Sequence, residues 1–149
     1  MSHNAFVALG VPANLAETLA RGGIDTPTPI QAATLPDSLG GRDLLGRGRT
    51  GSGKTYAFLL PILARLAPAG QGPRAARTPR SPRALVIVPT RELAIQIDTA
   101  LALLAKAAGL TSLTVFGGVG QSPQVRSLRA GDDIVIACPG RLEDLIGQG

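Results

Sequence analysis

The sequence has little of what a secreted or membrane protein needs. It holds a single cysteine, Cys138, so no disulfide can form within the chain. Its longest apolar run, from Tyr56 to Ala64, is interrupted by Pro61 and is far shorter than the roughly 20 residues of a bilayer-spanning helix. Met1 to Asn4 show no charged stretch leading into an apolar one, as a secretory signal has. These absences predict a protein of a reducing cytoplasm.

The positive charge of the chain is concentrated in one segment. The net charge is +5, and removing four arginines of the proline-rich stretch 68–83 leaves +1. The four are Arg74, Arg77, Arg80 and Arg83. Because they recur at every third residue, a polyproline II conformation would align them into a basic strip for a phosphate backbone. The alternative, which we favour, is a solvated linker whose charges serve solubility.

A glycine-rich stretch at 46–55 is the feature around which the chain is organised. Its residues Gly48 to Thr55 fit the pattern G-x-x-x-x-G-K-[ST], whose backbone N–H groups wrap a phosphate chain. The pattern lets the lysine, Lys54, reach the β- and γ-phosphates, and lets the hydroxyl of Thr55 reach Mg²⁺. Gly51 and Gly53 allow the backbone to turn tightly.

Apolar patterns and turn residues predict alternating helices and strands. With 44% hydrophobic residues the chain can bury a core. The run 84–88 is uninterrupted, which is typical of a strand buried on both faces. Gly22 is expected to end a helix in the left-handed conformation. The expected helices are 12–21, 30–39, 56–60, 93–108, 122–129 and 142–146, and the expected strands are 43–45, 84–88, 113–116 and 133–137.

This alternation predicts an α/β fold with a mainly parallel sheet flanked by helices. In such a sheet, ligands bind beyond the carboxyl ends of the strands. Three polar or glycine-containing segments, 89–91, 117–118 and 139–141, follow predicted strands there. Asp132 and Asp133 precede the last predicted strand and are expected to form a turn and not a metal site.

Five separated motifs, in order along the chain, resemble those of DEAD-box ATP-dependent RNA helicases. They are a Q motif at 23–31 preceded by an isolated aromatic, Phe6; motif I at 48–55; motif Ia at 89–94; a GG motif at 117–118; and motif Ib at 138–141. The resemblance implies the P-loop NTPase fold of a RecA-like domain. It divides the chain into a Q-motif region, 1–40, and a partial RecA-like ATP-binding domain, 41–149.

The resemblance implies two sets of binding residues. For ATP with Mg²⁺ they are Phe6, Ile24, Thr26, Gln31, Gly48, Arg49, Thr50, Gly51, Ser52, Gly53, Lys54 and Thr55. Of these, Lys54 and Thr55 are the catalytic candidates, and Thr55 would meet the metal that the nucleotide carries. For RNA they are Pro89, Thr90, Arg91, Gly117, Gly118, Pro139, Gly140 and Arg141, which would contact sugar and phosphate without reading sequence.

Two of the nucleotide-site roles have structural alternatives. The amide of Gln31 has a donor and an acceptor, and so matches the N6 and N7 edge of adenine. Its alternative is a plain residue of a helix start. Phe6 would offer adenine an apolar face, or would only anchor the N-terminal segment.

Three positions depart from the family pattern. Gly48 stands where the family usually has alanine, which is a mild change in a flexible loop. Ile24 replaces an aromatic residue, so stacking on adenine is expected to be weaker. Cys138 replaces a threonine, and because a thiol is the poorer donor, one phosphate contact is expected to weaken.

No predicted strand is followed by the acidic residue that a P-loop ATPase uses to hold Mg²⁺ and order water. In the family this carboxylate belongs to the Asp-Glu-Ala-Asp motif, which follows motif Ib. The chain therefore resembles an incomplete helicase domain.

We expect an ATP-dependent RNA helicase as the parent protein, and a fragment that binds ATP and RNA without hydrolysis or unwinding. We also expect exposed sheet edges to leave it marginally stable. A truncated RNA- or partner-binding module and a small phosphotransferase are the alternatives.

Overall fold

The computed structural model describes residues 4–67 and 82–149. The proline-rich stretch 68–83, predicted as a solvated linker or a basic strip, lies outside the described residues except for Pro82 and Arg83. The chain divides into two compact units. We call the first the N-terminal unit (Met1–Ala67 with Lys106–Gly109) and the second the sheet unit (Pro68–Ala105 with Leu110–Gly149).

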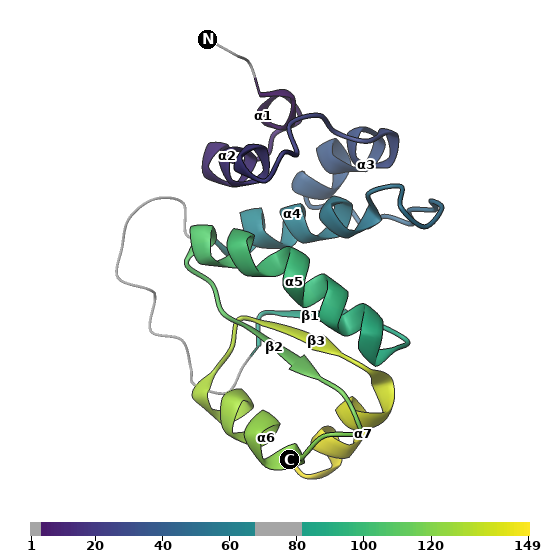
Figure 1. Cartoon of the computed structure of the whole chain (residues 1–149), viewed down its shortest axis with the longest axis vertical. Helices are drawn as coiled ribbons and strands as arrows, with labels where there is room; N and C mark the ends of the chain where they lie inside the picture. The colour runs from purple at the N-terminus through teal and green to yellow at the C-terminus, as the bar shows by residue number, and fades with distance from the viewer. Residues whose placement is uncertain (1–3, 68–81) are drawn as a thin grey trace. The chain divides into compact units, whose positions relative to one another are not determined.

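The described part of the N-terminal unit is helical. Its helices are α1 (Ala5–Ala8), α2 (Ala13–Arg21), α3 (Pro29–Leu39) and α4 (Lys54–Leu66), which Figure 1 shows in purple to teal. Their apolar faces meet in a core, because the side chains of Phe6, Leu15, Leu35, Leu59 and Leu63 are almost fully buried. The packing of α3 against α4 matters most here, because the phosphate loop lies between them in sequence.

Two local predictions for this unit are wrong. The helix at 13–21 forms as expected, but Gly22 has a φ of −86°, and the left-handed residue is Gly23, with a φ of +83°. The predicted strand 43–45 is absent from the described residues, and Leu45 is 92% exposed. A strand needs a partner for its backbone hydrogen bonds, and none of the described strands pairs with this segment.

The sheet unit has the predicted parallel sheet. Its strands are β1 (Ala84–Ile87), β2 (Ser112–Val115) and β3 (Ile134–Ala137), in the order β1-β3-β2. Both pairings are parallel, so all three carboxyl ends meet at one edge. Figure 1 shows α5 (Arg91–Ala108) on one face of the sheet, with α6 (Gln121–Ala130) and α7 (Pro139–Gly147) on the other.

Burial differs sharply between the central strand and its neighbour. All four residues of β3 are buried, as expected of a strand covered on both faces. In β1, however, Leu85 is 50% exposed and Ile87 is 58% exposed. The prediction that 84–88 is buried on both faces is therefore wrong. Leu85 and Ile87 are two residues apart and so lie on the same face of β1, and that face is only partly covered.

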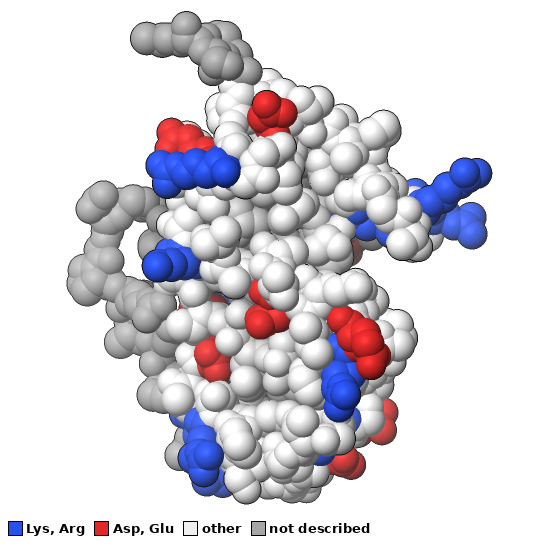
Figure 2. All heavy atoms as spheres, in the orientation of Figure 1, with Lys and Arg blue, Asp and Glu red and all other residues white. Residues whose placement is uncertain are grey.

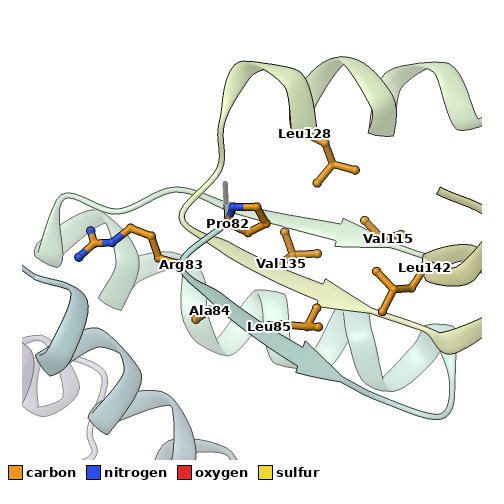
Figure 3. Close-up of a pocket in the computed structure, with 8 residues that line it drawn as sticks. All are labelled: Pro82, Arg83, Ala84, Leu85, Val115, Leu128, Val135 and Leu142. Carbon is orange, nitrogen blue, oxygen red and sulfur yellow. The ribbon is translucent and has the colours of Figure 1, made fainter. Parts of the chain in front are cut away.

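Leu85 lines a hollow on the α6 and α7 side of the sheet. The hollow has a volume of about 320 Å³. Figure 3 shows its mostly aliphatic lining, drawn from all three strands and both helices. Pro82, Arg83, Ala84, Leu85, Val115, Leu128, Val135 and Leu142 line it. It carries no convergent polar groups, so we treat it as a gap in the packing of the core.

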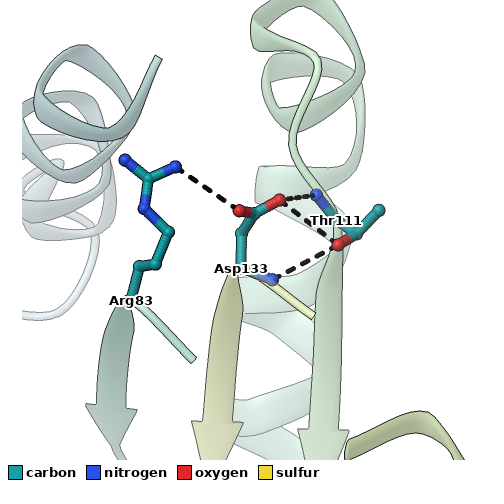
Figure 4. A network of polar contacts seen from close by, with 3 residues as sticks. All are labelled: Arg83, Thr111 and Asp133. Atoms are coloured by element: carbon teal, nitrogen blue, oxygen red, sulfur yellow. Dashed lines mark hydrogen bonds and ion pairs between the residues drawn. The ribbon is translucent and has the colours of Figure 1, made fainter. Parts of the chain in front are cut away.

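A buried aspartate joins the amino ends of the three strands (Figure 4). Asp133 is 1% exposed, and its Oδ2 accepts hydrogen bonds from the backbone N–H and the hydroxyl of Thr111, over 2.9 and 3.3 Å. Its Oδ1 lies 3.6 Å from Nη1 of Arg83. Each of the three residues immediately precedes a strand: Arg83 precedes β1, Thr111 precedes β2 and Asp133 precedes β3. The network therefore fixes where the strands begin. The sequence predicted a turn here but not this network.

Candidate functional site

The predicted phosphate loop connects α3 to α4 in the N-terminal unit, and the helix predicted at 56–60 forms and is longer, from Lys54 to Leu66. Gly51 and Gly53 have φ values of +80° and +92°, a backbone conformation that disfavours any other residue. At Gly53 there is also no room for a side chain. A Cβ there would lie 2.6 Å from both Gln31 Nε2 and Thr28 Oγ1.

Gln31 is bonded to this loop from the first turn of α3. Its side chain is 2% exposed, and its Nε2 donates to the carbonyl oxygen of Gly53 over 2.9 Å. Its Oε1 accepts from the backbone N–H of Thr28, also over 2.9 Å. This second bond is half of a capping box, so the helix-start alternative accounts for part of the geometry. The sequence located Gln31 as a site residue but gave no sign of its bond to the loop.

The loop is also closed by its own lysine. Nζ of Lys54 donates to the carbonyl oxygen of Gly48. A Cβ at Gly48 would lie 2.5 Å from Ser52 Oγ and 3.3 Å from the Lys54 stem, so this arrangement suits glycine better than alanine. The hydroxyls of Ser52 and Thr28 are buried beside the loop and have no hydrogen-bond partner among the described residues.

A hollow of about 510 Å³ adjoins the loop. One wall is made by apolar atoms at the start of α3, and the other by the loop backbone. It is lined by Thr28, Pro29, Ile30, Ala33, Arg47, Gly48, Gly51 and Ser52. An apolar wall beside unpartnered hydroxyls and glycine backbone fits a group that has both an aromatic ring and phosphates. The sequence predicted the glycines and Ser52 here, but it missed Thr28 and Arg47.

Several other predicted nucleotide residues do not line this hollow. Phe6 is 0% exposed in the core of the N-terminal unit, which agrees with the anchoring alternative. Ile24 is half-buried, and Thr26 is exposed, where its hydroxyl donates to Asp25 over 3.1 Å. Their roles at a base stay predictions. Three further residues complete the set: Arg49 and Thr50 are exposed in the loop, and Thr55 is half-buried in the first turn of α4.

In the sheet unit, the structure brings the predicted nucleic-acid residues together at the carboxyl edge of the sheet. Thr90 precedes α5, and its hydroxyl accepts from the N–H of Leu93 over 3.2 Å, which confirms the predicted cap. Gly117 and Gly118 follow β2, and α7 begins at Pro139 after β3. Because α5, α6 and α7 all start at this edge, their N-terminal partial charges favour an anion there.

The loops at this edge are bonded to one another by side chains. Nη2 of Arg141 donates to the carbonyl oxygen of Val119 over 2.9 Å, and its Nη1 donates to Oε1 of Gln124 over 3.2 Å. Nε2 of Gln124 donates in turn to the carbonyl oxygen of Phe116 over 3.1 Å. The guanidinium of Arg91 lies 5.8 Å from the centre of the Phe116 ring, within the range of a cation–π contact. The sequence gave no indication of Gln124.

Charge on the described surface is sparse and mixed in sign. On the face shown in Figure 2, Lys and Arg side chains are interspersed with Asp and Glu, and most atoms belong to other residues. Among the described residues, no group of three or more His, Cys, Asp or Glu side chains could hold a metal ion. A search of the described helices for one long and apolar enough to cross a membrane found none.

Comparison with known sequences gives one family. The model described as DEAD/DEAH box helicase matches residues 28–149. A chloroplastic DEAD-box ATP-dependent RNA helicase of Zea mays is 43% identical over 145 residues, covering 97% of this chain and 19% of that protein. An ATP-dependent RNA helicase of Haemophilus influenzae is 41% identical over 145 residues, covering 97% of this chain and 22% of that protein. The chain thus spans about a fifth of the length of these relatives. Since one is chloroplastic and one bacterial, the cytoplasmic location stays a prediction.

Comparison with solved structures gives the same result. An RNA helicase of Chaetomium thermophilum, solved with ADP, has a TM-score of 0.80 and 40% identity, covering 94% of this chain and 33% of that one. A hypothetical ATP-dependent RNA helicase of Sulfolobus tokodaii has a TM-score of 0.76 and 31% identity, covering 91% and 36%. These similarities confirm the predicted fold class, a parallel sheet flanked by helices as in RecA-like helicase domains.

Proposed function

The chain belongs to the DEAD/DEAH box helicase family, and we propose that it forms the ATP-binding and part of the RNA-binding surface of an ATP-dependent RNA helicase. The observation that carries the proposal is the closed phosphate loop, held by Gln31 on one side and bonded to itself through Lys54 on the other. Both helicase relatives align with nearly the whole chain. The parent enzyme would use ATP hydrolysis to separate short RNA duplexes.

ATP binding requires the loop to exchange its internal bond for bonds to phosphate. Lys54 would leave the carbonyl of Gly48 and move its ammonium to the phosphate chain, a charge-assisted and therefore stronger contact. The unpartnered hydroxyl of Ser52 supplies a further donor, and the N-terminus of α4 contributes its partial positive charge. Thr55 would hold Mg²⁺ carried in with the nucleotide, and the metal would supply charge neutralisation at the phosphates.

Gln31 can serve both the loop and the base. An amide side chain has two N–H donors and an oxygen with two lone pairs, and the contacts to Gly53 and Thr28 use one of each. One donor and one lone pair remain, which match the N6 and N7 edge of adenine, and the side chain, 2% exposed here, would have to become accessible to meet it. We therefore propose that Gln31 selects adenine while it holds the loop.

RNA would bind at the carboxyl edge of the sheet unit through its backbone. Exposed residues of three loops converge there, and three helix N-termini supply N–H donors for phosphate oxygens. The predicted contacts are those of motifs Ia, GG and Ib, from Thr90 and Arg91 to Gly140 and Arg141. Because they go to sugar and phosphate, binding is expected to be independent of base sequence and to weaken steeply with salt.

The 149-residue chain by itself is expected to bind without catalysis. In the described sheet, β1, β2 and β3 are followed by Val88, Phe116 and Cys138, so none of these strands runs into a carboxylate. Without such a group no residue would order the attacking water. We therefore propose that catalysis needs residues that this chain does not contain.

The test compares binding with hydrolysis on the purified chain. A fluorescent ATP analogue and a fluorescein-labelled single-stranded RNA are titrated separately and then together, and phosphate release is followed with RNA present. We expect saturable ATP and RNA binding with no phosphate release above background. RNA binding without any ATP binding would instead indicate the non-catalytic RNA-binding module. RNA-stimulated phosphate release would refute the inactivity of the chain.

A further inference from the structure

We propose that Gln124 is a positioning residue of the RNA surface: it holds the glycine loop after β2 and the side chain of Arg141 in one fixed arrangement. This inference rests on the proposed RNA binding of the carboxyl edge. Gln124 would not touch RNA itself, because its side chain lies beneath the loops, and it acts through the groups it bonds.

Both polar atoms of the Gln124 side-chain amide form hydrogen bonds. The residue lies in the first half of α6 and is 6% exposed. Its Nε2 donates to the carbonyl oxygen of Phe116, the last residue before the glycines, over 3.1 Å. Its Oε1 accepts from Nη1 of Arg141 over 3.2 Å. A buried amide with both ends paired to two different loops is a directional connector, which an apolar side chain cannot be.

Arg141 completes the connection from α7. Its Nη2 donates to the carbonyl oxygen of Val119 over 2.9 Å, while its Nη1 reaches Gln124. The loop 116–119 is therefore held at both ends, at Phe116 by Gln124 and at Val119 by Arg141. The planar guanidinium suits this role, because two of its N–H groups point at fixed angles to two acceptors. We call these four residues the loop brace.

The brace matters because the loop it holds contains two adjacent glycines. Gly117 and Gly118 are adjacent and exposed, and Gly118 has a φ of +82°. Glycine has more backbone freedom to lose than any other residue, so an unrestrained loop would have to be ordered during binding. A loop that is already ordered avoids that cost and binds RNA more tightly.

The brace also extends toward motif Ia. A Cβ added to Gly118 would lie only 3.0 Å from Nη1 of Arg91. The guanidinium of Arg91 therefore packs against the backbone of Gly118. The same guanidinium lies over the Phe116 ring. The position of the glycine loop, which Gln124 determines, therefore also determines where Arg91 lies.

The apolar packing of α6 does not depend on Gln124. Val125 and Leu128 are the α6 residues that pack against the buried cluster of Val115, Val135, Ala137 and Leu145. The variant Gln124→Leu is therefore expected to fold, with a thermal transition lowered by about a few degrees because the carbonyl of Phe116 loses its partner. Gln148→Leu is the matched control, because Gln148 donates to Gln121 over 2.6 Å, outside the loop brace.

The experiment measures RNA affinity and loop order in parallel. Kd for a fluorescein-labelled single-stranded RNA is measured between 50 and 200 mM salt. We expect Gln124→Leu to raise Kd about tenfold, the cost of ordering about one more backbone residue of the loop during binding. The slope of log K against log salt should be unchanged, because no charge is removed. Gln148→Leu should bind like the unaltered chain.

Amide hydrogen exchange at 117–119 is measured without RNA. Exchange should be faster in Gln124→Leu and in Arg141→Met. It should be only slightly faster still in the double variant, because both substitutions disrupt the same hydrogen-bond network. Unchanged exchange together with an RNA Kd within twofold of the unaltered chain would overturn the inference alone. Failure of the unaltered chain to bind RNA would instead overturn the proposed function, and this inference with it.

Discussion

The side-chain amide of Gln31 donates a hydrogen bond to the backbone carbonyl of Gly53 over 2.9 Å. The predicted base-reading residue and the phosphate loop are thus in direct contact, although 22 positions separate them in the sequence. A shift of the loop must move or break this bond, so recognition of the base and the conformation of the loop are expected to be coupled.

This coupling predicts which ligands a Gln31 variant loses. Gln31→Leu removes the bond to Gly53 and leaves that carbonyl without its partner, so we expect ATP to bind about tenfold more weakly. Inorganic triphosphate, which has no base, should also be weakened but by a smaller factor, because it loses only what Gln31 contributes through the loop. Calorimetric titration of both ligands measures the two factors. A loss confined to ATP would show that Gln31 acts on the base alone.

The two left-handed glycines of the loop give a matched pair. A Cβ at Gly51 meets no atom within 4 Å, whereas one at Gly53 collides with Gln31 and Thr28. Gly51→Ala should cost the chain about 1 kcal/mol, from backbone conformation alone. Gly53→Ala should cost about 1–3 kcal/mol more, because the neighbours must also move. Urea unfolding followed by circular dichroism measures the difference, and equal losses would contradict the packing described here.

Lys54 is expected to matter for binding and not for folding. Its side chain is exposed, and its bond to Gly48 stays within the loop. Lys54→Met should therefore leave the thermal transition nearly unchanged. It should weaken ATP binding by about tenfold to a hundredfold, the usual loss of a hydrogen bond to a charged group. Lys106→Met, in the last turn of α5, is the control that also removes one positive charge. If both variants bind ATP equally, the role of Lys54 at the phosphates is wrong.

The fold class followed from the sequence because the patterns that specify it are local. The apolar run at 84–88 and the cap at Thr90 each depend on neighbouring residues, and β1 and α5 form close to where they predict. Burial of β1 was predicted wrongly because it depends on which other elements cover each face of the strand. The absence of a strand at 43–45 also has a non-local cause, since pairing is a property of the whole sheet.

The candidate site was predictable only where a residue type identifies a role. The glycines, Lys54 and Gln31 belong to patterns with a known spacing. Gln124 belongs to no such pattern, and a polar residue within α6 is ordinarily assigned to solvent. Its function becomes visible only when Phe116 and Arg141, from two other loops, are found at its two amide atoms.

Asp133 supports the opposite edge of the same sheet, and the structure predicts its effect on stability. Asp133→Ala removes the acceptor for both Thr111 donors and the partner of Arg83. Because the carboxylate is 1% exposed, its loss should reduce the free energy of unfolding by about 2–4 kcal/mol. The side chain of Arg83 is 39% exposed, so water screens the ion pair and most of the loss should come from the bonds to Thr111.

The matched control for Asp133 is an aspartate whose ion pair is exposed. Oδ1 of Asp37 lies 3.5 Å from Nη1 of Arg42, and both side chains are at least half exposed. Asp37→Ala should therefore cost less than about 1 kcal/mol. Asp133→Asn, which keeps an acceptor for the N–H of Thr111, should lie between the two alanine variants. Urea unfolding at constant ionic strength ranks the three variants. If Asp133→Ala costs no more than Asp37→Ala, the buried network does not hold the strand ends together.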